Sequence, residues 1–424
     1  MTDATTHAAV SHRPRVLMIT HRFVHPPDRG DRIRTWHTLV ELARHCDVSL
    51  ASLADEPVRA SSWRAVYDRV EQLAIVPAPF GGSAVGLARA LASGRSATEQ
   101  TFYSPDLHRT LRQWAHDRPF DAVLSVCSST ARYLHGLDAG RCVVDLIDAD
   151  SRKWADFAEH ARGPRRWVYQ REARKLAEVE RALPCDHIAV TSPREARLIE
   201  ALQPDPAVTV VRNGVALPQN PTSAARTPPL VLFTGVLDYK PNVDGLDWFI
   251  RHVWPAVRQQ RTEARFQIVG RNPNARVRKL AATDGVELVG PVPDVQPYFQ
   301  NARLAVAPLP IARGVQNKAL QAMAAARPVV CSDAVHAGVA IDGRSPCIRP
   351  ANPDQWQQTL VTLLEKPTRA ASLGNAARRF AQRHYDWRQT LRPLISLLLP
   401  HTHNHAHTPA IHTHATSPAT RAAA

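Results

Sequence analysis

One stretch of the sequence decides the fold: Pro308-Leu-Pro-Ile-Ala-Arg-Gly-Val-Gln-Asn-Lys-Ala-Leu-Gln-Ala-Met-Ala-Ala-Ala-Arg-Pro-Val-Val330. The apolar run from Leu304 to Leu309, which leads into it, predicts a buried strand. From Val315 the apolar residues recur at helical spacing, and Pro328 ends the helix before a second apolar run. A strand, a loop, a helix and a further strand in this order predict a βαβ unit of a parallel sheet.

The junction between this loop and this helix carries positive charge. Gly314 lies at the turn, Arg313 precedes it, and Lys318 falls in the first turn of the helix. A helix N-terminus leaves about four backbone N–H groups unpaired and carries roughly half a positive charge. These groups together predict a phosphate site. The alternative is a βαβ unit whose basic first turn is simply solvated.

Length and composition indicate two folded domains. The chain has 424 residues, 44% of them hydrophobic, and is longer than a chain that folds around a single hydrophobic core usually is. The net charge of +15 is compatible with nucleic acid, an anionic membrane surface or phosphorylated small molecules as partners. The positive charges are mostly arginines scattered among acidic residues, without a basic tract interleaved with aromatics. This pattern disfavours binding to nucleic acid.

The cysteines and the hydropathy pattern favour a cytoplasmic location. The six cysteines are dispersed and form no CxxC pair, as is typical of a reducing compartment. Residues 1–14 are polar, lack the apolar stretch of a signal peptide and are expected to be disordered. No window approaches the roughly 20 apolar residues of a spanning helix. We therefore expect any contact with the inner membrane to be peripheral.

Residues 15–217 are predicted to form an α/β domain with a parallel sheet. Apolar runs such as 15–20 and 122–126 alternate with amphipathic helical patterns. Gly30 lies between the first strand and the helix that follows, where a glycine lets backbone approach a ligand. Asp148 and Asp150 follow a later strand, and the carboxyl ends of parallel strands face the ligand crevice of such sheets.

Residues 151–183 are predicted to form long helices with a basic and aromatic segment, Arg165-Arg-Trp-Val-Tyr-Gln-Arg-Glu-Ala-Arg-Lys175. A helix of this kind can lie on anionic lipid. The same pattern arises when a helix is solvated and buries its aromatics in the core, and this is the interpretation that we favour.

The second half of the chain repeats the α/β pattern, with strands expected over residues 230–235, 265–270 and 286–290. Asn242 is expected to cap the helix that follows the first of these strands. Residues 218–229 are rich in Pro, Ser and Thr and are predicted to form a linker. In the domain expected over residues 230–385, three successive strands end in glycine, which predicts a nucleotide-binding edge. A C-terminal helix is expected over residues 386–399, returning to the first domain.

The His-rich residues 400–424 are of low complexity and are predicted to be disordered. Their clustered imidazoles can bind Zn²⁺ or Ni²⁺ adventitiously. Because neither Cys nor a carboxylate lies nearby, we expect no structured metal site there.

Together these features resemble the GT-B glycosyltransferases, and within them glycosyltransferase family four. The resemblance extends over about residues 14 to 390. It rests on Val210-Val-Arg-Asn-Gly-Val215, Phe233-Thr-Gly235, Val269-Gly-Arg271, Val289-Gly-Pro-Val-Pro-Asp294 and Gln316 to Val330. Further stretches are similar to the sugar transferases of exosortase/PEP-CTERM exopolysaccharide systems: His25 to Arg34, Val144 to Trp154, Asp238 to Asn242 and Gly314 to Lys318.

The resemblance implies two Rossmann-like, doubly wound domains that face each other across a cleft. It implies a retaining transfer of a sugar from a nucleotide-sugar, held by the second domain, to a saccharide or polyprenyl-linked acceptor on the first domain. No metal and no cofactor besides the nucleotide-sugar co-substrate are expected, because cationic side chains and a helix N-terminus neutralise the leaving diphosphate.

The resemblance also assigns candidate residues. Those for catalysis are Lys318, Arg313 and Asp148. Those for donor binding are Gly235, Lys240, Arg271, Gly314, Asn317, Lys318 and Gln321. Those for acceptor binding are Gly30, Asp31, Arg34 and Asp150.

The sequence departs from the family at two positions. The family usually carries two glutamates separated by seven residues, and here those positions are Arg313 and Gln321. A glutamine can accept from one ribose hydroxyl and donate to the other, but it lacks the strength of a charged acceptor. The alternatives to an active transferase are a degenerate relative that binds nucleotide-sugar or a partner transferase, and an epimerase, which would need carboxylates in the cleft.

Overall fold

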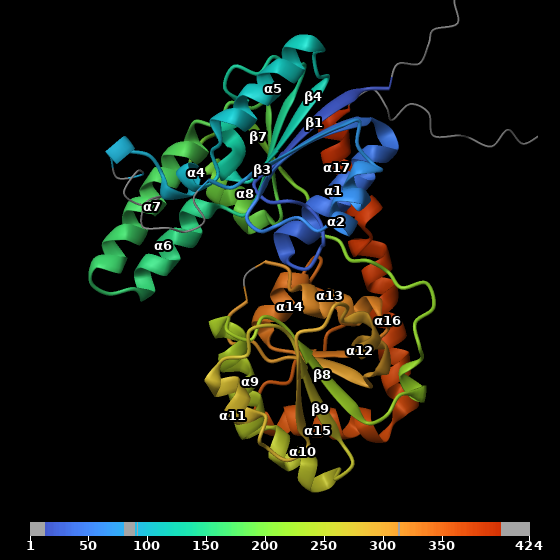
Figure 1. The fold of residues 1–424 in the computed structure, drawn as a ribbon. Coiled ribbons are helices and arrows are strands. Elements are labelled where there is room, and N and C mark those ends of the chain that lie inside the picture. The colour runs from blue at the N-terminus through green and yellow to red at the C-terminus, as the bar shows by residue number, and fades with distance from the viewer. Residues whose placement is uncertain (1–12, 80–89, 91, 313, 400–424) are drawn as a thin grey trace, which may run out of the picture.

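The computed structural model describes residues 13–79, 90, 92–312 and 314–399. It contains two parallel sheets, each covered by helices, which form two bodies stacked one above the other in Figure 1. The predicted α/β fold with two Rossmann-like domains is confirmed. The predictions for residues 1–12 and for the His-rich tail fall outside the described residues.

The first domain is built on a sheet whose described strands follow the order β3-β2-β1-β4-β5-β6-β7. All pairs are parallel, and β1, which lies between β2 and β4, is buried along its whole length because helices cover both faces of the sheet. The strands are β1 (Arg15–Thr20), β2 (Asp47–Ala54), β3 (Gln72–Pro77), β4 (Ala122–Val126), β5 (Cys142–Ile147), β6 (His187–Val190) and β7 (Ala207–Val210).

Helices cover both faces of this sheet, and two of them project beyond it. They are α1 (Gly30–His45), α2 (Ala60–Tyr67), α4 (Ala97–Thr101), α5 (Pro105–Asp117), η1 (Ser128–Leu134), α6 (Asp150–His160), α7 (Pro164–Arg181) and α8 (Pro193–Glu200). Figure 1 shows α6 and α7 side by side, extending away from the sheet.

The second domain has a smaller parallel sheet, with the described strands in the order β10-β9-β8-β11-β12. The strands are β8 (Leu230–Thr234), β9 (Arg265–Val269), β10 (Val286–Gly290), β11 (Leu304–Ala307) and β12 (Val329–Cys331). The helices are α9 (Lys240–His252), α10 (Trp254–Gln260), α11 (Ala275–Leu280), α12 (Gln296–Asn301), α13 (Asn317–Ala324), α14 (Asp333–Val339), α15 (Pro353–Glu365) and α16 (Pro367–Tyr385).

The chain passes between the domains twice, and the two passages run side by side. The backbone N–H of Val215 donates to the carbonyl of Tyr385 at 2.7 Å. Beside this bond, a Cβ on Gly214 would lie 2.5 Å from the ring of Trp387, so only glycine fits there. Helix α17 (Trp387–Leu398) then packs its apolar face into the core of the first domain, as the dark red helix beside β1 in Figure 1 shows.

The segment predicted as a linker, residues 218–229, is held against the second domain. Its short helix η2 (Ala224–Arg226) packs on α16, and Ala224 is buried. Arg378 donates to the carbonyl of Pro218 at 2.6 Å, Arg327 donates to that of Thr222, and Arg303 to that of Thr227. Ala224 and Thr227 are the buried residues of this segment, and hydrogen bonds from these arginines to its carbonyl groups hold the rest in place.

Candidate functional site

The second domain holds the ammonium group of Lys318 beside the end of β8. Lys318 lies in the first turn of α13, and its Nζ donates a hydrogen bond of 2.5 Å to Oδ1 of Asn242. The same Nζ lies 4.2 Å from the centre of the Phe233 ring, where the face of the ring attracts a cation. No carboxylate of the described residues pairs with it, and burial lowers the pKa of Lys318 to about 7.

A desolvated ammonium without a carboxylate partner is suited to an anionic ligand. Desolvation is what lowers the pKa of Lys318, and the charge of a phosphate at hydrogen-bond distance would raise it again. Lys318 lies at the N-terminus of α13, where the backbone N–H groups of the first turn carry a partial positive charge. This charge also favours an anion beside Lys318.

Asn242 positions this ammonium. Helix α9 begins at Lys240, with Tyr239 in the N-cap position, so the prediction that Asn242 caps the helix is wrong. The side chain of Asn242 is instead buried, donates to the carbonyl of Val236 at 2.8 Å and accepts from Lys318. The amide nitrogen of Asn242 bonds to Val236 and its amide oxygen bonds to Lys318, so Asn242 holds Lys318 against the end of β8.

Three neighbouring strands end in glycines, which we call the glycine edge: Gly235 after β8, Gly270 after β9 and Gly290 in β10. A Cβ on Gly235 would lie 3.1 Å from Nζ of Lys318. One on Gly270 would lie 1.7 Å from the carbonyl oxygen of Gly235. The predicted alignment of these glycines is confirmed by the parallel order of the strands. The absence of side chains lets Asn242 and Lys318 pack closely against the end of β8, while the N–H groups of Gly235 and Gly270 donate to Val269 and Gly290.

Helix α13 begins at Asn317, slightly later than the predicted start at Val315. The preceding Gly314 has a φ of +56°, in the left-handed region that glycine adopts without strain. Gly338 of α14 packs on this turn, since a Cβ there would lie 2.3 Å from the carbonyl oxygen of Gly314. No signal in the sequence points to Gly338, because its close contact depends on how α14 packs.

The candidate donor residues of this helix come together at its first turns. Gln321 follows Lys318 by about one turn, so the two side chains leave the same face of α13. Gln321 is half-buried, as is Asn317. Arg313, which is expected to neutralise charge during transfer, lies outside the described residues.

The two other cations predicted to bind the donor have acidic partners. Lys240 has an 85% exposed side chain and forms an ion pair of 2.5 Å with Asp244, one turn further along α9. Arg271 follows β9, and its guanidinium lies 3.6 Å from a carboxylate oxygen of Asp28 in the first domain. Lys240 therefore faces solvent, whereas Arg271 connects the two domains.

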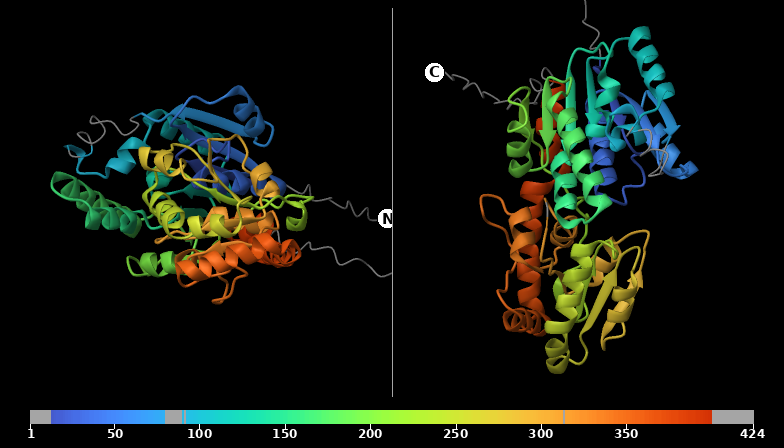
Figure 2. Two further views of the ribbon diagram at one scale, coloured as in Figure 1. Left: turned by 90° about the horizontal axis from the view of Figure 1, so that it is seen from below. Right: turned by 90° about the vertical axis from the view of Figure 1, so that its left-hand side faces the viewer.

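The loop after β1 faces this site from the first domain. A Cβ on Gly30 would lie 3.8 Å from Nδ2 of Asn317, and Asp28 contacts Arg271. The carboxyl ends of both sheets therefore meet at the junction between the two bodies that Figure 2 shows from the side. Gly30 lies beside Asn317 in this geometry, and its role in acceptor binding stays a prediction.

Asp31 forms ion pairs with residues of the loop after β1. It accepts from Arg22 at 2.9 Å and lies 3.4 Å from Nε2 of His21. Burial favours a higher pKa for Asp31, but the hydrogen bond and charge of His21 and the charges of Arg22 and Arg29 outweigh it and hold the pKa well below its usual range. Asp31 is thus a fixed negative charge rather than a proton acceptor.

Arg34 lies inside the first domain, with 1% of its side chain exposed. Its Nε and Nη2 donate to both carboxylate oxygens of Asp145, at 2.7 and 3.0 Å. Its Nη1 donates to the carbonyl of Val211 and to Oδ1 of Asn213, at 2.9 and 3.0 Å. These contacts tie α1 to β5 and to the first passage between the domains. They leave no surface for an acceptor, which corrects the role predicted for Arg34.

Asp148 and Asp150 stand at the carboxyl end of β5, where the sequence places them. Thr191 donates to Asp148 at 3.1 Å, and Ser128 donates to Asp150 at 2.7 Å. Desolvation raises the pKa of Asp148, and the hydrogen bond from Thr191 opposes this rise. Asp148 thus lies in the short turn between β5 and α6, at the carboxyl end of the sheet.

The same edge contains strained and buried groups that the sequence does not reveal. Cys127 after β4 and Ile147 in β5 have φ values of 70° and 67°, a conformation that costs such residues about 1–3 kcal/mol each. Glu180 of α7 accepts from the backbone N–H of Ser151 at 3.0 Å, and burial raises its pKa to about 7. Glu180 thereby supports the helix end that carries Asp150.

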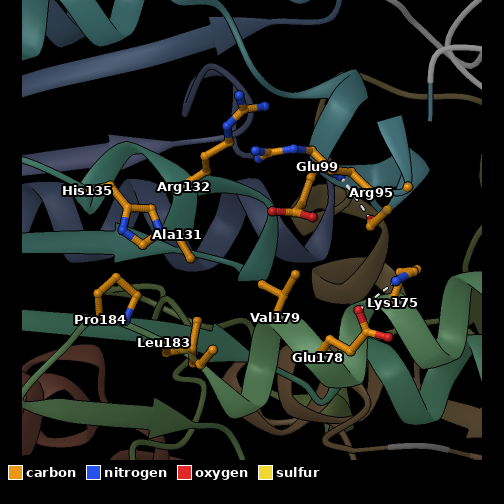
Figure 3. A pocket seen from close by; sticks show the side chains of 13 residues that line it. Arg95, Glu99, Ala131, Arg132, His135, Lys175, Glu178, Val179, Leu183 and Pro184 are labelled. Carbon is orange, nitrogen blue, oxygen red and sulfur yellow. Dashed lines mark hydrogen bonds and ion pairs between the residues drawn. The ribbon is translucent and has the colours of Figure 1, made fainter. Parts of the chain in front are cut away.

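A cavity of about 280 Å³ lies elsewhere in the first domain, between α4, η1 and α7. Figure 3 shows Arg95, Arg132 and Lys175 around it, together with Glu99 and Glu178. Lys175 and Glu178 form an ion pair of 2.7 Å. Cations and carboxylates are both present in this cavity, in contrast to the unpaired ammonium of Lys318.

Within the described residues, no group of three or more His, Cys, Asp or Glu side chains is arranged to hold a metal ion. None of the described helices combines the length and the apolar character that crossing a membrane requires.

Comparison with known proteins bears on the second domain and on the overall fold. Residues 228–366 match the family model described as glycosyl transferases group 1. This span contains the glycine edge, Asn242, Lys318 and Gln321. No curated protein matches the sequence.

Solved structures resemble the chain over most of its length. Sucrose-phosphate synthase from Thermosynechococcus elongatus is 16% identical, with a TM-score of 0.62 over 91% of this chain and 98% of that protein. The chain has the GT-B fold. HepE from Anabaena, solved with UDP and glucose, is 13% identical with a TM-score of 0.61, over 91% of this chain and 99% of HepE. A TarM variant from S. aureus, solved with fondaparinux, alpha-GlcNAc-glycerol and UDP, is 11% identical with a TM-score of 0.60, over 91% of this chain and 100% of TarM.

The GT-B fold explains why the candidate residues lie at facing edges. In both domains the parallel strands end at the junction, so their loops are the parts that can contact one ligand from two sides. The donor candidates lie on the loops and helix starts of the second domain, and Asp148 and Asp150 lie on the opposite edge.

Proposed function

We propose that this protein transfers a sugar from a nucleotide-sugar donor to a saccharide acceptor. The observation that carries the proposal is the half-buried ammonium of Lys318 at the start of α13, which Asn242 positions and which has no carboxylate partner among the described residues. The family match over residues 228–366 and the GT-B relatives solved with UDP support it.

In this proposal, Lys318 and the N-terminus of α13 bind the donor diphosphate beside the glycine edge, where no side chain projects from the ends of β8 and β9. Negative charge grows on the leaving diphosphate as the glycosidic bond breaks, and a preoriented cation stabilises that charge. Arg313 is proposed to assist, and Gln321 to hold the ribose. Since protein cations supply the charge, we propose a transfer that needs neither metal nor further cofactor.

The acceptor is proposed to bind at the opposite edge, beside Asp148 and Asp150. Asp148 is the carboxylate with the raised pKa, and it is proposed to orient the acceptor hydroxyl. Following the resemblance, we propose retention of configuration at the sugar carbon. We also propose that the acceptor is a growing exopolysaccharide or a lipid-linked saccharide in the cytoplasm.

The test is a screen for donor binding followed by a turnover assay. Thermal shifts with UDP-, GDP- and TDP-sugars identify the donor, and release of the nucleoside diphosphate with saccharide and polyprenyl-linked acceptors then reports transfer. The Asp148→Asn variant is expected to lose turnover at unchanged donor affinity, and addition of EDTA is expected to change neither.

The degenerate alternative predicts a different outcome, and the glutamine at position 321 is its motivation. A protein of this kind would bind the donor but release no nucleoside diphosphate with any acceptor. No binding of any nucleotide-sugar would contradict both proposals.

A further inference from the structure

The α6–α7 hairpin ends in a surface that the proposed transfer does not use. We call this surface the hairpin tip and define it by Phe157, Arg162, Arg165, Arg166 and Trp167. Its two aromatic residues are exposed by 44% and 53%. The three arginines are exposed as well. In Figure 1 the α6–α7 hairpin projects from the left side of the first domain.

The positive charge of the hairpin tip is open to a partner. Among the residues described by the structure, no carboxylate forms an ion pair with its three arginines. The nearest acids on α6 are occupied, because Arg152 contacts Asp156 at 2.7 Å and Glu159 at 3.1 Å. Glu159 lines the same hollow as Arg166, but its ion pair is with Arg152, so the tip presents guanidinium groups that form no ion pair among the described residues.

An aromatic cluster between the two helices supports the exposed rings. The ring of Trp154 lies 5.3 Å from that of Tyr169 and 5.9 Å from that of Phe157. These contacts fill the space between α6 and α7, so Phe157 is held at the surface and Trp167 extends beyond it. The favoured interpretation of the sequence, in which the aromatics of this segment enter the core, is therefore wrong for Trp167.

We propose that the hairpin tip docks on the surface of an anionic lipid bilayer. Exposed Trp and Phe side chains insert at the level of the headgroups, and neighbouring arginines pair with anionic lipid. Charge complementarity selects this partner over a neutral apolar one, and the aromatic residues favour lipid over a purely polyanionic partner such as nucleic acid.

Docking of the hairpin tip would also set the orientation of the cleft between the domains relative to the bilayer. Helix α6 runs from Asp150 at the acceptor edge to the tip, and its 11 residues span about 16 Å. A saccharide attached to a lipid carrier would then leave the bilayer beside the edge that carries Asp148 and Asp150. This second step rests on the proposed function, whereas the docking itself does not.

The experiment is flotation of the full chain with vesicles of phosphatidylcholine alone, or with about 30 mol % phosphatidylglycerol added. We expect binding to the anionic vesicles only, and a loss of binding at high salt, which screens exposed charges. The double variant Arg165→Gln/Arg166→Gln is expected to weaken binding about 30-fold, from about fivefold for each basic residue at the surface. Trp167→Ser is expected to weaken it about tenfold or more.

The matched control lies on α2, where Trp63 is 42% exposed and stacks on Tyr67 at 4.4 Å. Trp63→Ser and Arg64→Gln remove an equally exposed aromatic and an arginine from another surface, and they are expected to leave vesicle binding unchanged. An equal loss in both sets, or binding to a nucleic-acid duplex but not to anionic vesicles, would overturn the proposal.

Two further measurements keep the results interpretable. The unfolding temperature of each tip variant is expected to match that of the wild type, because the changed side chains are exposed. Donor affinity is expected to stay the same in these variants, so that failure of membrane docking and failure of the proposed transfer are distinguished.

Discussion

The lowered pKa of Lys318 leads to a prediction about how donor binding depends on pH. In the free protein its pKa is lowered to about 7, so about half of the molecules carry the charge at neutral pH. A diphosphate binds the charged form and raises this pKa. Below about pH 7 the ammonium is already charged and affinity is constant. Above it, each binding event takes up a proton, and affinity declines by about tenfold per pH unit until the pH reaches the pKa of the complex.

The size of the effect follows from the contacts of the side chain. Replacing Lys318 by alanine removes one charged hydrogen bond to the diphosphate, worth about 1.5–3 kcal/mol, or roughly 10- to 150-fold in affinity. The arginine variant is expected to recover part of this loss, because a planar fork replaces a compact charge. It should also abolish the pH dependence, since a guanidinium stays protonated throughout this range.

Calorimetry in buffers of different ionisation enthalpy measures both the affinity and the proton uptake. The wild type at about pH 8 is expected to take up a large fraction of one proton per bound nucleotide, and neither Lys318→Ala nor Lys318→Arg should take up any. Lys366→Ala, an exposed lysine of the same domain, is the matched control. Unchanged affinity in Lys318→Ala, or no proton uptake by the wild type, would refute the placement of the diphosphate.

Three further predictions concern other parts of the chain. Arg34→Met leaves the buried carboxylate of Asp145 unpaired, so urea unfolding is expected to show a loss of about 3–5 kcal/mol in stability; a loss below about 1 kcal/mol would contradict the structural role given to this pair. Gln321→Glu restores a charged acceptor for the ribose and should strengthen nucleotide binding about fivefold by calorimetry, whereas weaker or unchanged binding would place Gln321 away from the ribose. Arg327→Met frees the carbonyl of Thr222, and limited proteolysis is then expected to cut between residues 218 and 229, a segment that should resist cleavage in the wild type; equal cleavage of both proteins would show that Arg327 does not hold it.

Much of the fold follows from local pattern. The apolar runs predict β1, β4, β8 and β9 within about one residue of their observed bounds, because a strand buried on both faces must be apolar along its length. The glycine edge was predictable for the same reason, since parallel strands necessarily end at a common edge. The first turn of α13, with Gly314 and Lys318, also lies within a single short segment and is visible in the sequence.

The partners of the charged side chains were decided only by the tertiary structure. Asp31 and Arg34 are three residues apart on α1, yet one faces the junction between the domains and the other is buried against Asp145, more than a hundred residues away. Asn242 appears in the sequence as a helix cap and is found beside Lys318. Whether a cationic side chain forms an ion pair depends on which distant carboxylate packs next to it. The position of that carboxylate depends in turn on how whole helices pack against the sheet. Local periodicity carries no information about that packing, so the sequence shows which cations are candidates for a phosphate site, and the fold decides that Lys318 has no carboxylate partner among the described residues.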